Sequence, residues 1–259
     1  MQGLVQSKSI HLTDLLYASL PPAIALAFLL SACLAHAEPT TWTGTGDWSD
    51  PVRWSAGVPE AGDEVLIANG SVLLTNDTLL LASFTMTNGT FTFSNLDAVV
   101  RASNVWITRG TVTHVTNSAT TTNGVGEWPI DGRVYFQCTN FYLASPGKID
   151  VSDRGWRTKT NLSSKGYGPG AGTNGGAGGY GGYGGNYSDG GGRPYGNIAK
   201  PDQPGSGAGP GTSAAGIGAG GGLVWIDAAG GTVSINGSIL ANGTGPTRYA
   251  ASGGGIEPD

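Results

Sequence analysis

Glycine dominates the stretch from residue 166 to residue 222, where it accounts for 25 of 57 residues. The same stretch contains no Leu, Val, Phe, Met, Trp or Cys. Glycine loses the most backbone entropy on ordering and offers no side chain to bury. We therefore expect residues 161–222 to form a Gly/Tyr-rich low-complexity insertion. On this reasoning it has no core of its own and is the least ordered part of the mature chain.

The first residues are typical of an export signal. An apolar run from Ala23 to Leu34 is followed by Ala35-His36-Ala37, which has the small-residue pattern of a signal peptidase site. About 12 apolar residues are too few to span a bilayer, which needs about 20. The sequence predicts a signal peptide at residues 1–37 and no transmembrane helix in the mature chain.

A lipoprotein signal is the alternative interpretation of the same region. Leu30-Ser31-Ala32-Cys33 resembles the bacterial lipobox, which would end the signal at residue 32 and attach lipid to Cys33. The two interpretations predict, respectively, a secreted or cell-surface protein and an outer-membrane lipoprotein.

Charge and cysteine content exclude several classes of function. Charged residues make up only 12% of the chain and the net charge is −5, which disfavours nucleic acid as a partner. After residue 37, Cys138 is the one cysteine and His114 the one histidine. An intrachain disulfide and a Cys/His zinc site are therefore excluded from the mature chain, and we expect no metal or cofactor.

Short alternating segments from Asp63 to Val115 predict an all-β structure. Turn dipeptides such as Asn69-Gly70 and Asn88-Gly89 separate runs rich in Val, Leu, Phe and Thr. Asn-Gly between such runs indicates either hairpins or the corners of a β-solenoid, in which each coil stacks on the one before it.

Two similar segments on either side of the glycine-rich stretch favour the solenoid. Residues 147–155 and 237–245 share the pattern G-x-I-x-(V/A)-x-x-x-G. Their apolar residues alternate in the same phase, so we expect Ile149 and Val151 to lie in one stack with Ile239 and Ala241.

The segment from Thr41 to Ile67 resembles the entry motif of large secreted bacterial right-handed β-helix proteins and, more loosely, the G8 domain. Residues 148–255 are similar to a Gly-rich β-helical module of surface proteins. The resemblance implies a right-handed parallel β-helix (β-solenoid) with a long Gly-rich loop insertion.

This architecture predicts three parts in the mature chain. They are an N-terminal cap with solenoid coils at residues 38–160, the insertion at 161–222 and returning coils at 223–259. The last residues carry no charged cap, so we expect the chain to be a piece of a longer protein.

Three tryptophans recur at intervals of six within the entry motif. Trp42, Trp48 and Trp54 are expected to cap the open first coil, where large apolar rings have no neighbouring coil. A platform on which sugars stack is the alternative interpretation.

Chemistry-bearing residues are few. Asp150, Asp153 and Arg154 could share one corner and form the carboxylate pair and cation of a polysaccharide lyase or glycoside hydrolase on a β-helix scaffold. A solvated structural turn is the alternative for this corner. His114 with Cys138 is a poor catalytic pair, because each lies in a strand pattern.

Tyrosines on glycine-rich loops suit a binding surface, since the rings are rigid and amphipathic. Five of them are candidates: Tyr167, Tyr180, Tyr183, Tyr187 and Tyr195. We therefore predict a noncatalytic, exported, adhesin-like β-solenoid that contacts an extracellular polysaccharide or another cell surface. The alternative is the polysaccharide-active enzyme.

Overall fold

A computed structural model describes residues 39–158, 165–186, 190–197, 199–210, 218–244 and 251–258. These residues contain β-strands and one 3-10 turn, η1 (Pro51–Arg53), and no α-helix. The predicted signal peptide and Cys33 lie outside the described residues. The protein is thus all-β over the part that the structure describes.

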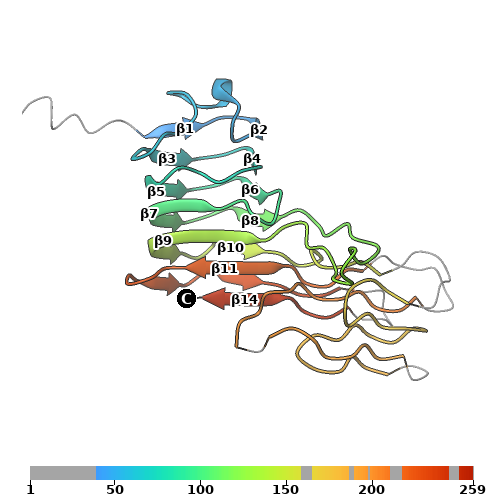
Figure 1. The fold of residues 1–259 in the computed structure, drawn as a ribbon. Helices are drawn as coiled ribbons and strands as arrows, with labels where there is room; N and C mark the ends of the chain where they lie inside the picture. Colours follow the sequence, from blue (N-terminus) through green and yellow to red (C-terminus); the bar gives the residue numbers. More distant parts are fainter. Residues whose placement is uncertain are drawn as a thin grey trace, which may run out of the picture. The chain divides into compact units, whose positions relative to one another are not determined.

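The strands form two sheets in which every pairing is parallel. One sheet contains β1 (Thr40–Trp42), β3 (Glu64–Ile67), β5 (Leu81–Met86), β7 (Val100–Ile107), β9 (Val134–Leu143), β11 (Leu223–Asp227), β12 (Val233–Ile235) and β14 (Gly255–Pro258). The other contains β2 (Thr45–Asp47), β4 (Ser71–Leu74), β6 (Thr90–Phe93), β8 (Thr111–His114), β10 (Lys148–Asp150) and β13 (Ser238–Leu240). Figure 1 shows the strands following one another from β1 to β14.

From β1 to β11, consecutive strands alternate between the sheets and do not pair with each other. β3 and β4, which flank Asn69-Gly70, pair with β5 and β6 instead. The hairpin interpretation of the Asn-Gly dipeptides is therefore wrong. These dipeptides are corners at which the chain passes from one sheet to the other.

Glycines in the left-handed region of backbone conformation stack at this corner. Gly70 and Gly89 have φ values of +82° and +94°. A Cβ on Gly89 would lie 2.5 Å from the carbonyl oxygen of Gly70, which accepts a 2.9 Å hydrogen bond from the Thr90 N–H. Only glycine tolerates both this φ and this approach of one turn to the next.

Alternate residues of both sheets meet in an aromatic core. Phe84 packs edge to face against Phe91 at 5.1 Å between ring centroids, and Phe136 lies 5.9 Å from Phe84 and 5.5 Å from Phe93. All four rings are fully buried. Offset and edge-to-face contacts of this kind stabilise a core beyond the area that they bury.

The repeated pattern around the glycine-rich stretch stacks as predicted. β10 pairs with β13 so that Ile149 lies beside Ile239, and the Val151 N–H donates to the Leu240 carbonyl at 2.8 Å. Ile149 and Val151 are buried, and Ile239 and Ala241 pack against the same core. The segment predicted to form returning coils, residues 223–259, contains β11 and β12 as well as β13.

The final strands leave core-facing side chains partly uncovered. Val233 and Ile235 stack beside Phe141 and Leu143, which are fully buried, yet they are 38% and 40% exposed. At the other end of the sheets the first strands are covered by buried indole rings. The two ends of the core therefore differ in how they are closed.

The described segments of the glycine-rich stretch are packed on one another, although none of their side chains belongs to the hydrophobic core. These segments lie side by side as extended chains beside the strands (yellow and orange in Figure 1). The segment 204–209 is buried, and its N–H groups at Gly205, Gly207 and Gly209 donate to the carbonyls of Gly221, Tyr167 and Gly176. One segment thus bonds to three others.

Backbone contact explains how the described segments pack without an apolar core. A Cβ on Gly176 would lie 1.9 Å from the Gly190 carbonyl oxygen, and a Cβ on Gly190 would lie 1.8 Å from that of Thr173. The segments approach so closely because no side chain separates them, and backbone hydrogen bonds between segments replace apolar side-chain burial. Backbone hydrogen bonds also join this region to the segments on either side of its predicted boundaries at residues 160 and 222. The Gly155 N–H donates to the Gly220 carbonyl, and the Gly221 N–H donates to the Ser252 carbonyl.

Substitution of the corner glycines tests the stacked turns. We expect Gly89→Ala to lower the free energy of unfolding by about 3 kcal/mol, because it adds a clash with Gly70 to the cost of a positive φ. Gly57→Ala is the matched control, since Gly57 has φ +90° with open space around it and should cost about 1 kcal/mol. Urea unfolding measures both, and equal losses would contradict the stacking.

A second pair of substitutions tests the packing of the glycine-rich region. Gly176→Ala should destabilise this region by about 2 kcal/mol or more, whereas Gly182→Ala, with open space around it, should be neutral within about 0.5 kcal/mol. Chymotrypsin cleavage followed by mass spectrometry measures local opening. Cleavage within 166–210 that is fast in the parent and unchanged by Gly176→Ala would show that these segments are not packed.

Candidate functional site

The predicted catalytic corner lies just after β10, and its polar groups are engaged in local structure. The Asp150 carboxylate accepts from the Ser152 N–H at 3.1 Å and from Lys148 Nζ at 3.4 Å. Burial alone would raise the pKa of Asp150, but these hydrogen bonds and the Lys148 charge outweigh it and hold the pKa below its ordinary value. A general acid needs the opposite shift.

Asp153 and Arg154 hold neighbouring turns in place. Asp153 has φ +59°, and its Oδ1 accepts from the Ala219 N–H at 3.2 Å and from the Thr244 hydroxyl. Arg154 donates from Nε to Thr113 Oγ1 at 3.2 Å and from Nη1 to Thr116 Oγ1 at 2.8 Å. These contacts are those of a structural turn.

His114 and Cys138 are unsuited to nucleophilic catalysis. His114 is buried, its Nδ1 lies 2.7 Å from the Val115 carbonyl, and its Nε2 accepts from the Leu223 N–H at 3.1 Å. Burial, and to a smaller extent the Arg154 charge, lowers the pKa of His114 from 6.5 to about 4. Burial raises the pKa of Cys138 to about 12, so its thiol stays protonated at neutral pH.

The three tryptophans of the entry motif are buried in the first turn. Trp54 packs edge to face on Trp42 at 5.0 Å and on Trp48 at 4.7 Å, and its Nε1 donates to the Trp48 carbonyl at 2.7 Å. Their faces are covered by one another and by the core, so they offer no surface on which a sugar could stack.

Four of the five candidate tyrosines fall among the described residues, and they differ in setting. Tyr183 is 79% exposed, while Tyr195 is largely buried and its hydroxyl donates to the Pro204 carbonyl at 2.6 Å. The Tyr180 and Tyr195 rings meet edge to face at 5.1 Å. The ring centroid of Tyr167 lies 6.3 Å from that of Trp128. Tyr187 lies outside the described residues.

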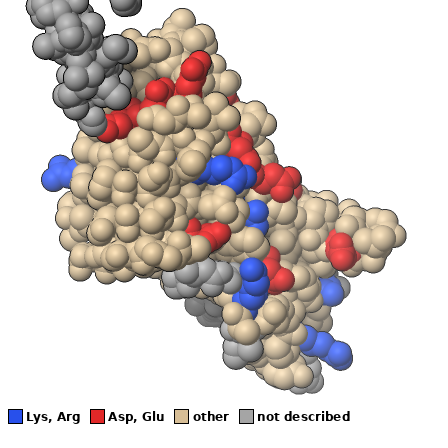
Figure 2. Space-filling view, turned by 60° about the vertical axis from the view of Figure 1, so that its left-hand side comes forward, with Lys and Arg blue, Asp and Glu red and all other residues tan. Residues whose placement is uncertain are grey.

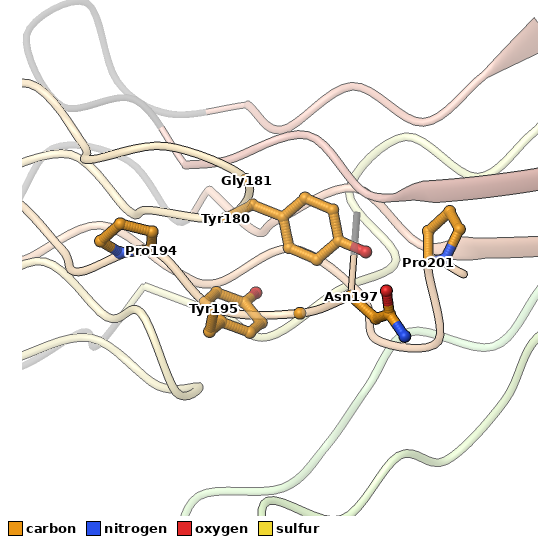
Figure 3. Close-up of a pocket in the computed structure, with 7 residues that line it drawn as sticks. Tyr180, Gly181, Pro194, Tyr195, Asn197 and Pro201 are labelled. Carbon is orange, nitrogen blue, oxygen red and sulfur yellow. The ribbon is translucent and has the colours of Figure 1, made fainter. Parts of the chain in front are cut away.

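Tyr180 and Tyr195 line a pocket of about 360 Å³, the Tyr180 pocket (Figure 3). Its lining is aromatic and proline-rich, with one side-chain amide. It consists of Tyr180, Gly181, Pro194, Tyr195, Gly196, Asn197 and Pro201.

A second pocket, the Trp128 pocket, has a volume of about 440 Å³ and shares Tyr195 and Gly196 with the first. It adds two carboxylates and an amide to an aromatic and apolar lining. The complete set is Gly126, Glu127, Trp128, Ile130, Pro169, Tyr195, Gly196, Asp202 and Gln203. Because the two pockets share these residues, they are neighbours and together make up the candidate site.

Basic side chains lie near this site but not in its lining. Arg133 lies 4.0 Å above the Trp225 ring, Lys200 lies 5.2 Å from the same ring, and Trp225 Nε1 donates to the Pro201 carbonyl at 3.1 Å. On the face in Figure 2, charged side chains of both signs are dispersed over a largely uncharged surface.

The sequence pointed to Tyr180 and Tyr195 but not to the other side of the site. Trp128 and Glu127 lie in a segment without a strand pattern, and Asp202 and Gln203 come more than 70 residues later. A tryptophan outside any alternating run was the one available signal, because such a ring needs a tertiary partner.

The part of the chain that the structure describes holds neither a cluster of metal ligands nor a membrane-spanning helix. It contains no group of three or more His, Cys, Asp or Glu side chains arranged to hold a metal ion. It also contains no helix of the length and apolarity needed to cross a bilayer.

Comparison of the chain with protein-family models, curated proteins and solved structures finds no match. The resemblance of Thr41–Ile67 to a β-helix entry motif therefore stays a prediction.

The depressed pKa of His114 predicts a pH dependence of stability. The unfolded chain binds a proton near pH 6.5 that the folded chain binds only near pH 4, so stability should fall as the pH drops through this window. The free energy of unfolding should fall by about 2 kcal/mol between pH 7.5 and pH 5. Urea unfolding of the parent and of His114→Gln measures it. An unchanged pH slope in the variant would contradict the assignment.

Proposed function

We propose that the chain is a noncatalytic, exported β-solenoid of the right-handed parallel type, adhesin-like and located at the bacterial surface or secreted. It binds an extracellular polysaccharide through its glycine-rich region. The alternation of strands between two parallel sheets, one turn stacked on the next, supports the solenoid, and the entry-motif resemblance supports its hand. Export rests on the N-terminal sequence.

The Tyr180 pocket and the neighbouring Trp128 pocket carry the binding proposal. Sugar-binding sites combine aromatic faces for the C–H surfaces of the rings with fixed polar groups for the hydroxyls. The aromatic faces here are those of Tyr180, Tyr195 and Trp128. The polar groups are those of Asn197 and Asp202. Tyr180 and Tyr195 are joined by a backbone hydrogen bond of 2.8 Å, and the Trp128 ring packs near the rings of Trp156 and Tyr167.

The polysaccharide-active enzyme is the less supported alternative. Its candidate base and cation, Asp153 and Arg154, use their polar atoms on backbone and threonine groups, and the pKa of Asp150 is lowered. Neither pocket is lined by any of these three residues.

Binding and turnover are separated by one experiment. The full chain is incubated with a panel of insoluble polysaccharides and with whole bacterial cells. Retained protein, reducing ends and unsaturated uronate products are then measured over time. We expect retention on at least one material with no accumulation of either product, and the same result for Asp150→Asn. Product that accumulates in the parent and is lost in Asp150→Asn would establish an enzyme instead.

A further inference from the structure

We propose that the two pockets are neighbouring subsites for one uncharged, hydroxyl-rich polysaccharide chain. This inference rests on the proposed function and deepens it by naming the ligand class and its placement. The other occupants considered are an anionic polysaccharide and a proline-rich peptide.

The shared wall of the pockets favours a chain over a single sugar. Tyr195 and Gly196 line both pockets, so the two subsites are direct neighbours. Tyr195 is fixed at this junction, because its hydroxyl donates to the Pro204 carbonyl and its ring packs edge to face on Tyr180. A rigid ring between two subsites suits consecutive residues of a linear glycan.

The charge of the lining favours an uncharged ligand. Glu127 and Asp202 are exposed carboxylates in the Trp128 pocket, and neither pocket is lined by Lys or Arg. The Asp202 charge also adds to burial in raising the pKa of Tyr180, which shows that its field extends into the Tyr180 pocket. A uronate chain would meet like charge along its length, whereas hydroxyls donate well to carboxylates.

The nearby cations do not reverse this balance. Arg133 and Lys200 lie over the Trp225 ring, in cation–π contacts beside Pro201 rather than in the pocket lining. Side-chain amides at Asn197 and Gln203 complete the polar lining, and an amide both donates to and accepts from hydroxyl groups. The lining thus matches a polymer that carries hydroxyls and no carboxylates.

Affinity electrophoresis of the full chain tests the inference. Native gels contain a neutral polymer (mannan, dextran, laminarin or xylan), an anionic one (polygalacturonate or alginate) or a soluble polyproline peptide. We expect retardation by at least one neutral polymer and weaker or no retardation by the others. Tyr180→Ala should reduce the apparent affinity about fivefold. Asp202→Lys should weaken neutral binding and strengthen binding to polygalacturonate.

Matched controls keep the outcomes distinct. Tyr183→Ala removes an exposed ring of the same region outside both linings, and Glu60→Lys makes the same charge change on an exposed residue far along the sequence. Both variants should bind the neutral polymer with an apparent affinity within about twofold of that of the parent. Thermal unfolding verifies each variant, and Asn197→Ala, at an exposed position, replaces Tyr180→Ala if the latter does not fold.

Three results would overturn the inference. Retardation by the anionic polymer alone would refute the ligand class but leave the polysaccharide-binding role intact. Retardation by the peptide alone would refute both the ligand class and that role. Neutral binding that Tyr180→Ala, or its replacement, leaves unchanged would place the site elsewhere. Retardation by no polymer and retention on no insoluble polysaccharide or cell surface would overturn the proposed function itself.

Discussion

Close contact between backbones is the constraint on which the rest of this structure depends. In the sheets, each turn hydrogen-bonds to the one before it, and at the corners Gly70 and Gly89 allow a carbonyl of one turn to lie where a Cβ would otherwise be. In the glycine-rich region the same approach joins Gly176 to Gly190 and Gly190 to Thr173. Ordering so much glycine costs backbone entropy, and dense hydrogen bonding between neighbouring segments offsets that cost.

The two regions differ in what fills their interiors. Between the sheets, aromatic rings such as Phe84 and Phe136 fill the interior and stabilise the stack. Among the glycine segments most close contacts join backbones, although the fully buried Trp156 ring packs beside Gly168 and lies 6.2 Å from the Tyr195 ring. Tyr180 and Tyr195 line a pocket beside these segments.

Polar groups with catalytic precedent serve structure in this protein. His114 at the end of β8 accepts through Nε2 from the Leu223 N–H at the start of β11, its Nδ1 lies against the Val115 carbonyl, and Asp153 accepts from the Ala219 N–H. Such groups must be hydrogen-bonded when they are buried, and their partners fix turns rather than substrates. The entry tryptophans likewise fill the first turn, whereas Val233 and Ile235 remain partly exposed at the last strands.

The sequence by itself determined the parallel stacking of Ile149 on Ile239 and the burial of alternate residues, because a period of two and a repeated glycine pattern specify which side chains share a face. It could not show that glycine segments pack on one another, since backbone hydrogen bonds leave no periodicity in side-chain type. Nor could it join Trp128 and Glu127 to Tyr195 and Asp202. Only the tertiary structure decided that juxtaposition, because it depends on which extended segment lies beside which.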